Sequence, residues 1–317
     1  MSVQLTEFLK HYGPRLEENL LHWLPLSNKP GTEVFNKAVY YAVFPSGKRM
    51  RPLFTLLAAD TVGGDPEQAL PIACAIEYLH TCSLIFDDLP AMDNAVERRG
   101  RKPTHQIFGE DVAMLAALAL FNQGYALIGQ INPLGQVNRT FQRLLSEMAT
   151  CIGPNGMIGG QFVDLRLEAN QNGRLRPVSY LKTTELTRLM LTAGAIVAGA
   201  EDGHINALAE FGETLGNAYQ MLDDIVDEVE DCSATALPRK GRDVHALWQK
   251  ANNRLKEARD GVVESLADKN PALLIELADK IFSKLKKQAA SRLGKDKWHW
   301  DSVSQGSQSL QSKSQWD

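Results

Sequence analysis

Residues 67–93 read EQALPIACAIEYLHTCSLIFDDLPAMD, a long apolar run that ends in carboxylates. The apolar side chains recur at helical spacing and predict a helix over 67–86. The aspartates Asp87, Asp88 and Asp93 follow this run directly. Carboxylates crowded so closely repel one another and raise each other's pKa, so divalent cations stabilise a cluster of this kind.

A second cluster, Asp223, Asp224 and Asp227, lies far along the chain. Asp223 and Asp227 are four residues apart, so a helix would place both carboxylates on one face, with Asp224 beside them. Paired aspartates most often mark a solvated acidic surface, but both clusters here directly follow apolar residues. We therefore predict that the clusters are two halves of one metal site, and the hard oxygen ligands favour magnesium.

The two outer aspartates of the first cluster need a break in the helix. Asp87 and Asp93 are six residues apart and would point in different directions on an unbroken helix. Pro90 lies between them and donates no backbone hydrogen bond, so we expect the helix to end or bulge there. The chain can then return Asp93 towards Asp87.

The composition indicates a globular protein with a substantial core. The chain has 317 residues, 44% of them hydrophobic, and a formal net charge of −4 that argues against nucleic-acid binding. Its longest apolar stretch, Val112–Phe121, is shorter than the roughly 18 residues that span a bilayer, so we expect no membrane span. The four cysteines form no CxxC pair, and residues 1–18 carry no signal or transit peptide pattern. We therefore expect a cytoplasmic protein.

Helical periodicity continues along almost the whole chain, and no segment alternates convincingly with period two. The predicted fold class is therefore all-α. Residues 192–200 are rich in small side chains and predict a central helix. Residues 295–317 are polar and of low complexity, so we expect one helical domain over 1–294 and a disordered tail over 295–317. The other predicted helices cover residues 5–24, 34–44, 53–62, 109–131, 137–150, 160–169, 183–200, 205–228, 247–266 and 271–293.

Three basic elements accompany the carboxylates. Residues 48–51 place three cations in four positions, the pair Arg98 and Arg99 follows the first aspartate cluster, and Lys182 precedes Thr183. Arginine forks and metal-bound carboxylates together compensate the negative charges of a diphosphate. We therefore expect a site that binds phosphate groups beside the aspartates.

With these elements the chain resembles the trans-isoprenyl diphosphate synthases of the farnesyl and geranylgeranyl group. The resemblance runs from about Val34 to Lys286 and depends on the order of its motifs. A single aspartate motif would be weak evidence, whereas the ordered set is specific. The set comprises Gly47-Lys48-Arg49-Met50-Arg51-Pro52, His80 ahead of Asp87, the first aspartate cluster with Arg98-Arg99, Phe108-Gly109-Glu110-Asp111-Val112-Ala113, Gly156-Met157-Ile158-Gly159-Gly160-Gln161 with Asp164, Lys182-Thr183, and Gln220 ahead of the second aspartate cluster.

The resemblance implies a large single-domain helical bundle of the isoprenoid synthase type around a deep central cavity, with the two aspartate motifs facing each other across its mouth. It also implies magnesium, three ions per active site, for which manganese can substitute. By analogy the metal ligands are Asp87, Asp93 and Asp223, while Asp88, Asp224 and Asp227 complete or support the shell. Arg98, Lys182 with Thr183, and Gln220 would bind the allylic diphosphate, and Lys48, Arg51, His80 and Arg99 would bind isopentenyl diphosphate, with Arg49 facing solvent.

The implied reaction is a prenyl transfer. Cations stabilise the departing diphosphate, the allylic carbon becomes carbocation-like, the isopentenyl double bond attacks it, and a proton is then lost. The implied substrates are isopentenyl diphosphate and dimethylallyl, geranyl or farnesyl diphosphate. The implied assembly is a homodimer.

The resemblance implies that product length is set by how far the growing chain descends beside the helix before Asp87. Cys82 and Ser83 would lie nearest the tail of the allylic substrate, with Leu79 lining the next turn. Farnesyl-forming bacterial relatives tend to carry an aromatic residue at the position of Cys82. Its absence favours geranylgeranyl diphosphate (C20) as the product over farnesyl diphosphate (C15).

The sequence also departs from the family pattern. Residues 95–97 read Ala-Val-Glu where the family continues the first motif with aspartates, and Ala117-Leu118 replaces a common Gly-Asp pair. The loop after Asp227 is short, and cations at 239, 240 and 242 could substitute for its usual lysine. The first difference reduces the number of acidic residues around the expected metal site. The second concerns helix packing, and the third concerns closure of the site.

Two alternatives keep the fold and change the function. A terpene cyclase would ionise an allylic diphosphate without isopentenyl diphosphate, and it would not need the second set of cations at Lys48, Arg51 and Arg99. A non-catalytic regulatory subunit would bind a synthase partner. Degenerate relatives of that kind usually lose an aspartate motif, and both motifs are intact here.

Overall fold

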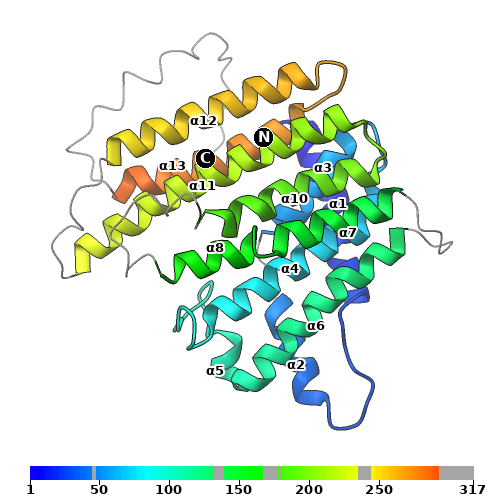
Figure 1. Ribbon diagram of the computed structural model, residues 1–317, viewed down its shortest axis with the longest axis vertical. Helices are drawn as coiled ribbons and strands as arrows, with labels where there is room; N and C mark the ends of the chain where they lie inside the picture. The colour runs from blue at the N-terminus through cyan, green and yellow to red at the C-terminus, as the bar shows by residue number, and fades with distance from the viewer. Residues whose placement is uncertain (45–47, 132–138, 167–177, 179, 235–243, 293–317) are drawn as a thin grey trace.

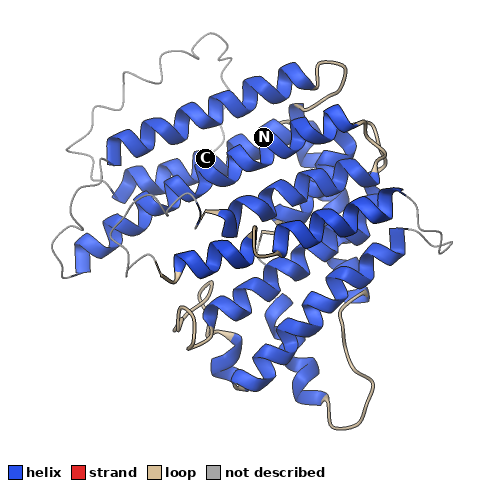
Figure 2. Ribbon diagram, in the orientation of Figure 1, coloured by secondary structure: helices blue, strands red, loops and turns tan. Residues whose placement is uncertain are grey.

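The computed structural model describes residues 1–44, 48–131, 139–166, 178, 180–234 and 244–292, with side chains except at 226–234, 244–245 and 289–292. In this part of the chain the regular structure is helical, and the sole β feature is an isolated bridge between Arg98 and Arg101 (Figure 2). The predicted all-α class is confirmed. The elements are α1 (Val3–His22), α2 (Glu33–Val43), α3 (Met50–Thr61), η1 (Pro66–Ala69), α4 (Leu70–Asp88), α5 (Thr104–Phe108), α6 (Glu110–Ile128), η2 (Gly129–Ile131), α7 (Arg139–Ile152), α8 (Met157–Asp164), α10 (Leu181–Val197), α11 (Asp202–Ala234), α12 (Val244–Ser265) and α13 (Ala272–Arg292).

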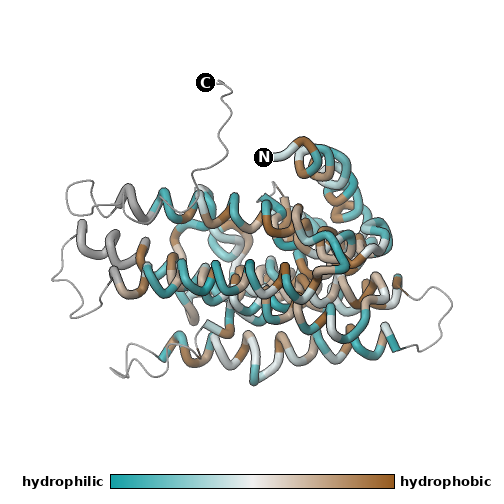
Figure 3. The backbone as a smooth tube through the Cα atoms, turned by 90° about the horizontal axis from the view of Figure 1, so that it is seen from above, coloured by the Kyte–Doolittle hydropathy of each residue, from teal (hydrophilic) through white to brown (hydrophobic). Residues whose placement is uncertain are grey.

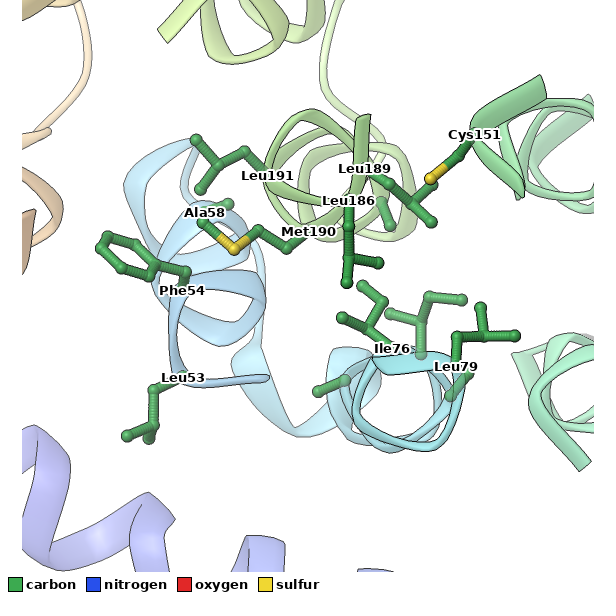
Figure 4. Close-up of a cluster of buried hydrophobic side chains, with 14 of the residues drawn as sticks. Leu53, Phe54, Ala58, Ile76, Leu79, Cys151, Leu186, Leu189, Met190 and Leu191 are labelled. Atoms are coloured by element: carbon green, nitrogen blue, oxygen red, sulfur yellow. The ribbon is translucent and has the colours of Figure 1, made fainter. Parts of the chain in front are cut away.

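Helix α10 is central to the bundle and contacts α3, α4, α7, α8 and α11 (Figure 1). Its residues 189–196 are all buried, which confirms the central helix predicted from the small residues. Figure 4 shows Met190 directed towards α3, and Leu186 directed towards Ile76 of α4. The core thus joins α10 to two helices, α3 and α4, that are distant from it in sequence.

Helix α4 is buried on nearly all sides from Leu70 to Cys82. It contacts α1, α2, α3, α6 and α10, so each of its faces meets another helix. A helix covered in this way can be apolar all round, whereas the outer helices are amphipathic. Hydrophobic and hydrophilic segments alternate along those outer helices in Figure 3. The burial of α4 fixes the position of the aspartates at its end.

The observed boundaries differ from the predicted ones at a few places. The run predicted as one helix over 67–86 is the short turn η1 followed by α4, whose first turn contains Pro71. The helix predicted over 160–169 begins earlier, at Met157, and ends at Asp164. The five-residue helix α5 has no counterpart in the sequence analysis, since so short a segment shows no helical period.

Two helical stretches, Pro66–Asp88 and Glu110–Ile131, are long and apolar enough to cross a bilayer by length and composition alone. The first is 78% buried and coincides with the core helix α4, whereas the second is only 39% buried. A core helix and an interface helix pass the same test, so the expected absence of a membrane span stays a prediction. The division into a domain over 1–294 and a tail also stays a prediction, because residues 293–317 lie outside the described residues.

Candidate active site

The first aspartate cluster lies where α4 ends. The helix stops at Asp88, and Leu89 follows with extended backbone. Pro90 excludes a further helical turn because it has no N–H to donate. The chain then turns back, and the Asp93 N–H donates to the Asp87 carbonyl oxygen at 2.9 Å. The predicted interruption is confirmed, and it returns Asp93 to the end of the helix.

Two cations hold the buried carboxylates of this cluster. Lys182 Nζ lies 3.2 Å from Asp87 Oδ2, and the Arg98 guanidinium donates to Asp88 Oδ1 through Nε at 2.8 Å and Nη2 at 2.5 Å. Burial raises the pKa of Asp87 to about 6, although Lys182 and Arg98 lower it, and Asp93 adds to the rise. Further positive charge beside Asp87 would therefore stabilise its ionised form.

The second aspartate cluster lies on α11, where Asp223 and Asp224 are half-buried. Tyr180, the residue before α10, donates its hydroxyl to Asp224 Oδ2 at 2.8 Å. Two residues later, Lys182 binds Asp87 of the first cluster. Neighbouring residues at the start of one helix thus contact one aspartate of each cluster. That the two clusters face each other stays a prediction. Asp227 belongs to α11, but its side chain lies outside the described residues.

Helix α8 brings another carboxylate to this place. Asp164 Oδ2 lies 3.9 Å from Lys182 Nζ, so Lys182 lies between two carboxylates. The approach of α8 depends on Gly160, since a Cβ there would lie 2.4 Å from the Lys182 backbone nitrogen. The family motif around Gly160 therefore has a local structural reason.

The two other residues predicted for the allylic diphosphate lie on the same helices. Thr183 is half-buried in the first turn of α10, and Gln220 is half-buried on α11, three residues before Asp223. Their contact with a substrate stays a prediction.

A second basic cluster gathers around His80 on α4. Nη1 of Arg51 lies 3.0 Å from His80 Nε2, and Nη2 of Arg99 lies 3.1 Å from the same atom. Both guanidinium groups donate, so Nε2 accepts and the imidazole is neutral with its proton on Nδ1. Burial and the positive charges of Arg51 and Arg99 hold the pKa of His80 well below its ordinary value. Two cations around a neutral ring leave an excess of positive charge that suits an anion.

Lys48, the fourth residue predicted for this cluster, is exposed just before α3. Its pKa is lowered by a side-chain hydrogen bond with Lys284 of α13 and by slight burial. The ammonium of Lys48 is therefore near a second ammonium rather than near a carboxylate. Lys284 is a basic residue beside Lys48 that no sequence motif indicates.

The neutral state of His80 predicts a pH dependence of stability. Because its folded-state pKa lies below the unfolded value of about 6.5, only the unfolded chain binds this proton as the pH falls through that value. Between about pH 8 and about pH 5.5, His80 should lower the free energy of unfolding by about 1 kcal/mol. His80→Gln keeps a hydrogen-bond acceptor but cannot titrate, so on acidification this variant should lose less free energy of unfolding than the wild type, by that amount. Urea unfolding at both pH values measures the two losses of stability. Equal losses in variant and wild type would contradict the neutral state assigned to His80.

Arg49 is buried, and the expectation that it faces solvent is wrong. Its side chain is 7% exposed, and it donates to Glu77 Oε1 at 2.7 Å and to Glu17 Oε1 at 2.9 Å. Glu77 is 3% exposed on α4, one turn before His80. Arg49 adopts a left-handed backbone conformation, φ 46°, and Met50 then begins α3. The ion pair therefore fastens the start of α3 to α1 and α4, where Arg51 meets His80.

The residues predicted to control product length line one side of α4. Cys82 and Leu79 are buried, and Ser83 is half-buried with its hydroxyl donating to the His80 carbonyl oxygen at 2.9 Å. Burial raises the pKa of the Cys82 thiol, and the charge of Asp87 raises it further, to about 12. Cys82 is thus a small neutral side chain one and a half turns below the aspartates. Its role in product length stays a prediction.

Comparison with known proteins agrees with this geometry. The family model for polyprenyl synthetase matches residues 32–245. The chain is 34% identical over 240 residues to geranylgeranyl pyrophosphate synthase 6, mitochondrial, of Arabidopsis thaliana, covering 72% of this chain and 71% of the relative. It is 36% identical over 228 residues to farnesyl diphosphate synthase of Geobacillus stearothermophilus, covering 71% and 76%.

A solved structure supports the fold independently of these sequence matches. The apo structure of a FPP/GFPP synthase from Zymomonas mobilis superposes with a TM-score of 0.76 and 26% identity. The match covers 89% of this chain and 99% of that chain. The predicted isoprenoid synthase fold is confirmed. The chain belongs to the polyprenyl synthetase family.

Proposed function

We propose that this short-chain prenyltransferase condenses isopentenyl diphosphate with an allylic diphosphate, and that its principal product is geranylgeranyl diphosphate. The observation that supports the proposal most is the start of α10, where Tyr180 contacts the second aspartate cluster and Lys182 contacts the first. A diphosphate placed there would meet both clusters and Lys182 together. The separate cluster around His80 offers a place for the second diphosphate.

The residues of the chain have distinct tasks in this reaction. Arg98 and Lys182 would turn from the aspartates to the allylic diphosphate and neutralise its charge as it leaves, with Gln220 and Thr183 beside them. Arg51, Arg99, His80 and Lys48 would hold isopentenyl diphosphate with its double bond towards the allylic carbon. Buried apolar side chains of α4 and α10 exclude water from the developing carbocation.

The carboxylates fit the magnesium that the family implies. They are hard oxygen donors, two of them are buried, and burial keeps the pKa of Asp87 raised despite two nearby cations. No three His, Cys, Asp or Glu side chains are gathered as an ion site among those that the structure describes. We infer that Asp87, Asp93 and Asp223 would hold the ions, three per site, with manganese able to substitute. When bound, magnesium supplies positive charge to the leaving diphosphate.

The two substrate sites should respond differently to mutation. Arg51→Ala should raise KM for isopentenyl diphosphate by at least about tenfold and leave KM for the allylic substrate nearly unchanged, because a charge-assisted contact is lost at one site only. His80→Ala should act in the same direction. Lys182→Ala is the complementary variant and should chiefly affect the allylic side. Steady-state kinetics with each substrate varied in turn measures both effects, and equal damage to both substrates would show that the sites are wrongly assigned.

A second copy of the chain is the proposed partner. The outer face of α6 exposes Leu115 (58%), Leu118 (53%) and Met114, an apolar group larger than scattered surface residues. An interface helix explains why the apolar stretch Glu110–Ile131 is only partly buried. We infer a homodimer that packs through α6. Sedimentation velocity should give a dimer for the wild type and a monomer for Leu115→Glu/Leu118→Glu, and a dimer in both would contradict this interface.

Product analysis is the test of the proposed function. Purified protein incubated with isopentenyl diphosphate and, separately, dimethylallyl, geranyl or farnesyl diphosphate should give a C20 product. Hydrocarbon formed from an allylic diphosphate alone would support a terpene cyclase instead, and activity only after addition of a synthase partner would support a regulatory subunit.

A cytoplasmic location is also proposed, and it is supported by the unpaired thiols of Cys74, Cys82 and Cys151.

A further inference from the structure

Helices α4 and α6 approach closely where α6 has a glycine. A Cβ on Gly124 would lie 3.1 Å from both Cγ and Cδ2 of Leu79 and 3.5 Å from the carbonyl oxygen of Ala75. Leu79 and Ala75 are four residues apart and share one face of α4. The side chain of Leu79 therefore occupies the space that a larger residue at position 124 would fill.

The buried face of α6 explains this approach. It is built from Ala113, Ala116, Ala117, Leu120, Gly124 and Leu127, mostly small residues at helical spacing. Small side chains allow two helices to pack closely, and Gly124 gives the least hindered position of that face. Leu79 is only 3% exposed, so its side chain is shielded from solvent.

We propose that Gly124 is a specificity-determining residue, because its missing side chain provides a recess that holds Leu79 against α6. In that position Leu79 leaves room for a growing prenyl chain beside α4. A side chain at position 124 would push Leu79 away from α6 and into that room. The inference deepens the proposed function and depends on it, since it requires that the prenyl chain passes Leu79.

Gly124→Ala should shorten the product. The added methyl group would be closer to Leu79 than about nine in ten real Cβ contacts, so Leu79 must shift by a few tenths of an ångström. A displaced Leu79 competes with the last isoprene unit, and one methyl-sized change in an apolar pocket can alter selectivity by about tenfold or more. We therefore expect the ratio of C15 to C20 product to rise by about tenfold. Radiolabelled or mass-spectrometric chain-length analysis measures this ratio.

Three controls separate this effect from general damage. Gly129→Ala, at the end of the same helix, adds a methyl group that meets nothing within 4 Å, and it should leave the ratio unchanged. Cys82→Tyr places a ring closer to the aspartates and should shift the products to C15. Leu79→Ala/Gly124→Ala removes the displaced side chain, so it should restore C20 or give a longer product.

The outcomes distinguish the inference from the proposed function. If the wild type elongates no allylic substrate, the proposed function fails. If the wild type makes C20 and Gly124→Ala gives the same ratio, the recess has no role and the inference fails. If Gly124→Ala does not fold, the double variant decides: a folded protein that makes C20 or longer products supports the inference, and one that stops at C15 overturns it.

Discussion

Asp87→Ala should lower kcat by at least about 10²-fold, since we assign this buried carboxylate, paired with Lys182, to the proposed metal site. Its removal takes away a ligand for the charge that stabilises the leaving diphosphate, and it also releases Lys182. Stabilisation of the leaving group matters most in the transition state, so kcat should change more than KM. Asp224→Ala on the opposite cluster should have a loss of similar size.

Single-turnover and steady-state assays at saturating substrates measure the effect of Asp87→Ala. Asp279→Ala is the control, because Asp279 is an exposed aspartate of α13 that pairs with Arg259 and belongs to neither aspartate cluster. That variant should keep kcat within about twofold. EDTA should abolish turnover of the wild type, and near-normal rates in EDTA or in Asp87→Ala would show that the aspartates are not the catalytic ligands.

Arg49→Met should lower the free energy of unfolding by about 3–5 kcal/mol, the usual cost of leaving one partner of a buried ion pair without the other. The stranded partner is Glu77, which lies 2.7 Å from Arg49 and is almost fully buried. Glu17 is less affected because it is partly exposed and can turn to solvent. The start of α3 should loosen as well, since Arg49 also donates to the Val43 carbonyl oxygen.

Urea unfolding followed by circular dichroism measures this loss. Arg259→Met removes the surface ion pair with Asp279, in which both side chains are 57% exposed, and should cost no more than about 1 kcal/mol. Arg49→Met/Glu77→Leu should lose less stability than Arg49→Met, because neither buried charge remains. A loss below about 1 kcal/mol for Arg49→Met would mean that the pair contributes little to the fold.

Much of the fold follows from local sequence. Apolar spacing predicts α4, and Pro90 predicts both its end and the return of Asp93, because a proline acts on the residues beside it. The small side chains of residues 192–200 predict that α10 is a central helix, and its residues 189–196 are buried. The five residues of α5 give too short a period to be recognised.

The site is predicted less completely, because its contacts join residues that are distant in sequence. The aspartates, Lys182 and the His80 cluster carry motifs, so the resemblance identifies them. Tyr180 and Glu77 carry no such signal, and their roles depend on which helices pack together. Arg49 lies within a recognised motif, yet its partners are on α1 and α4, and sequence spacing gives no reason to expect it buried.

The ends of two helices place opposite partial charges at the candidate active site. Asp87 and Asp88 are the last residues of α4, where the helix dipole carries partial negative charge, and Lys182 lies in the first turn of α10, where the dipole is positive. Lys182 reaches Asp87, so the two helix ends are neighbours. Opposite partial charges therefore meet where the two helices end, and they strengthen the pairing of Lys182 with Asp87.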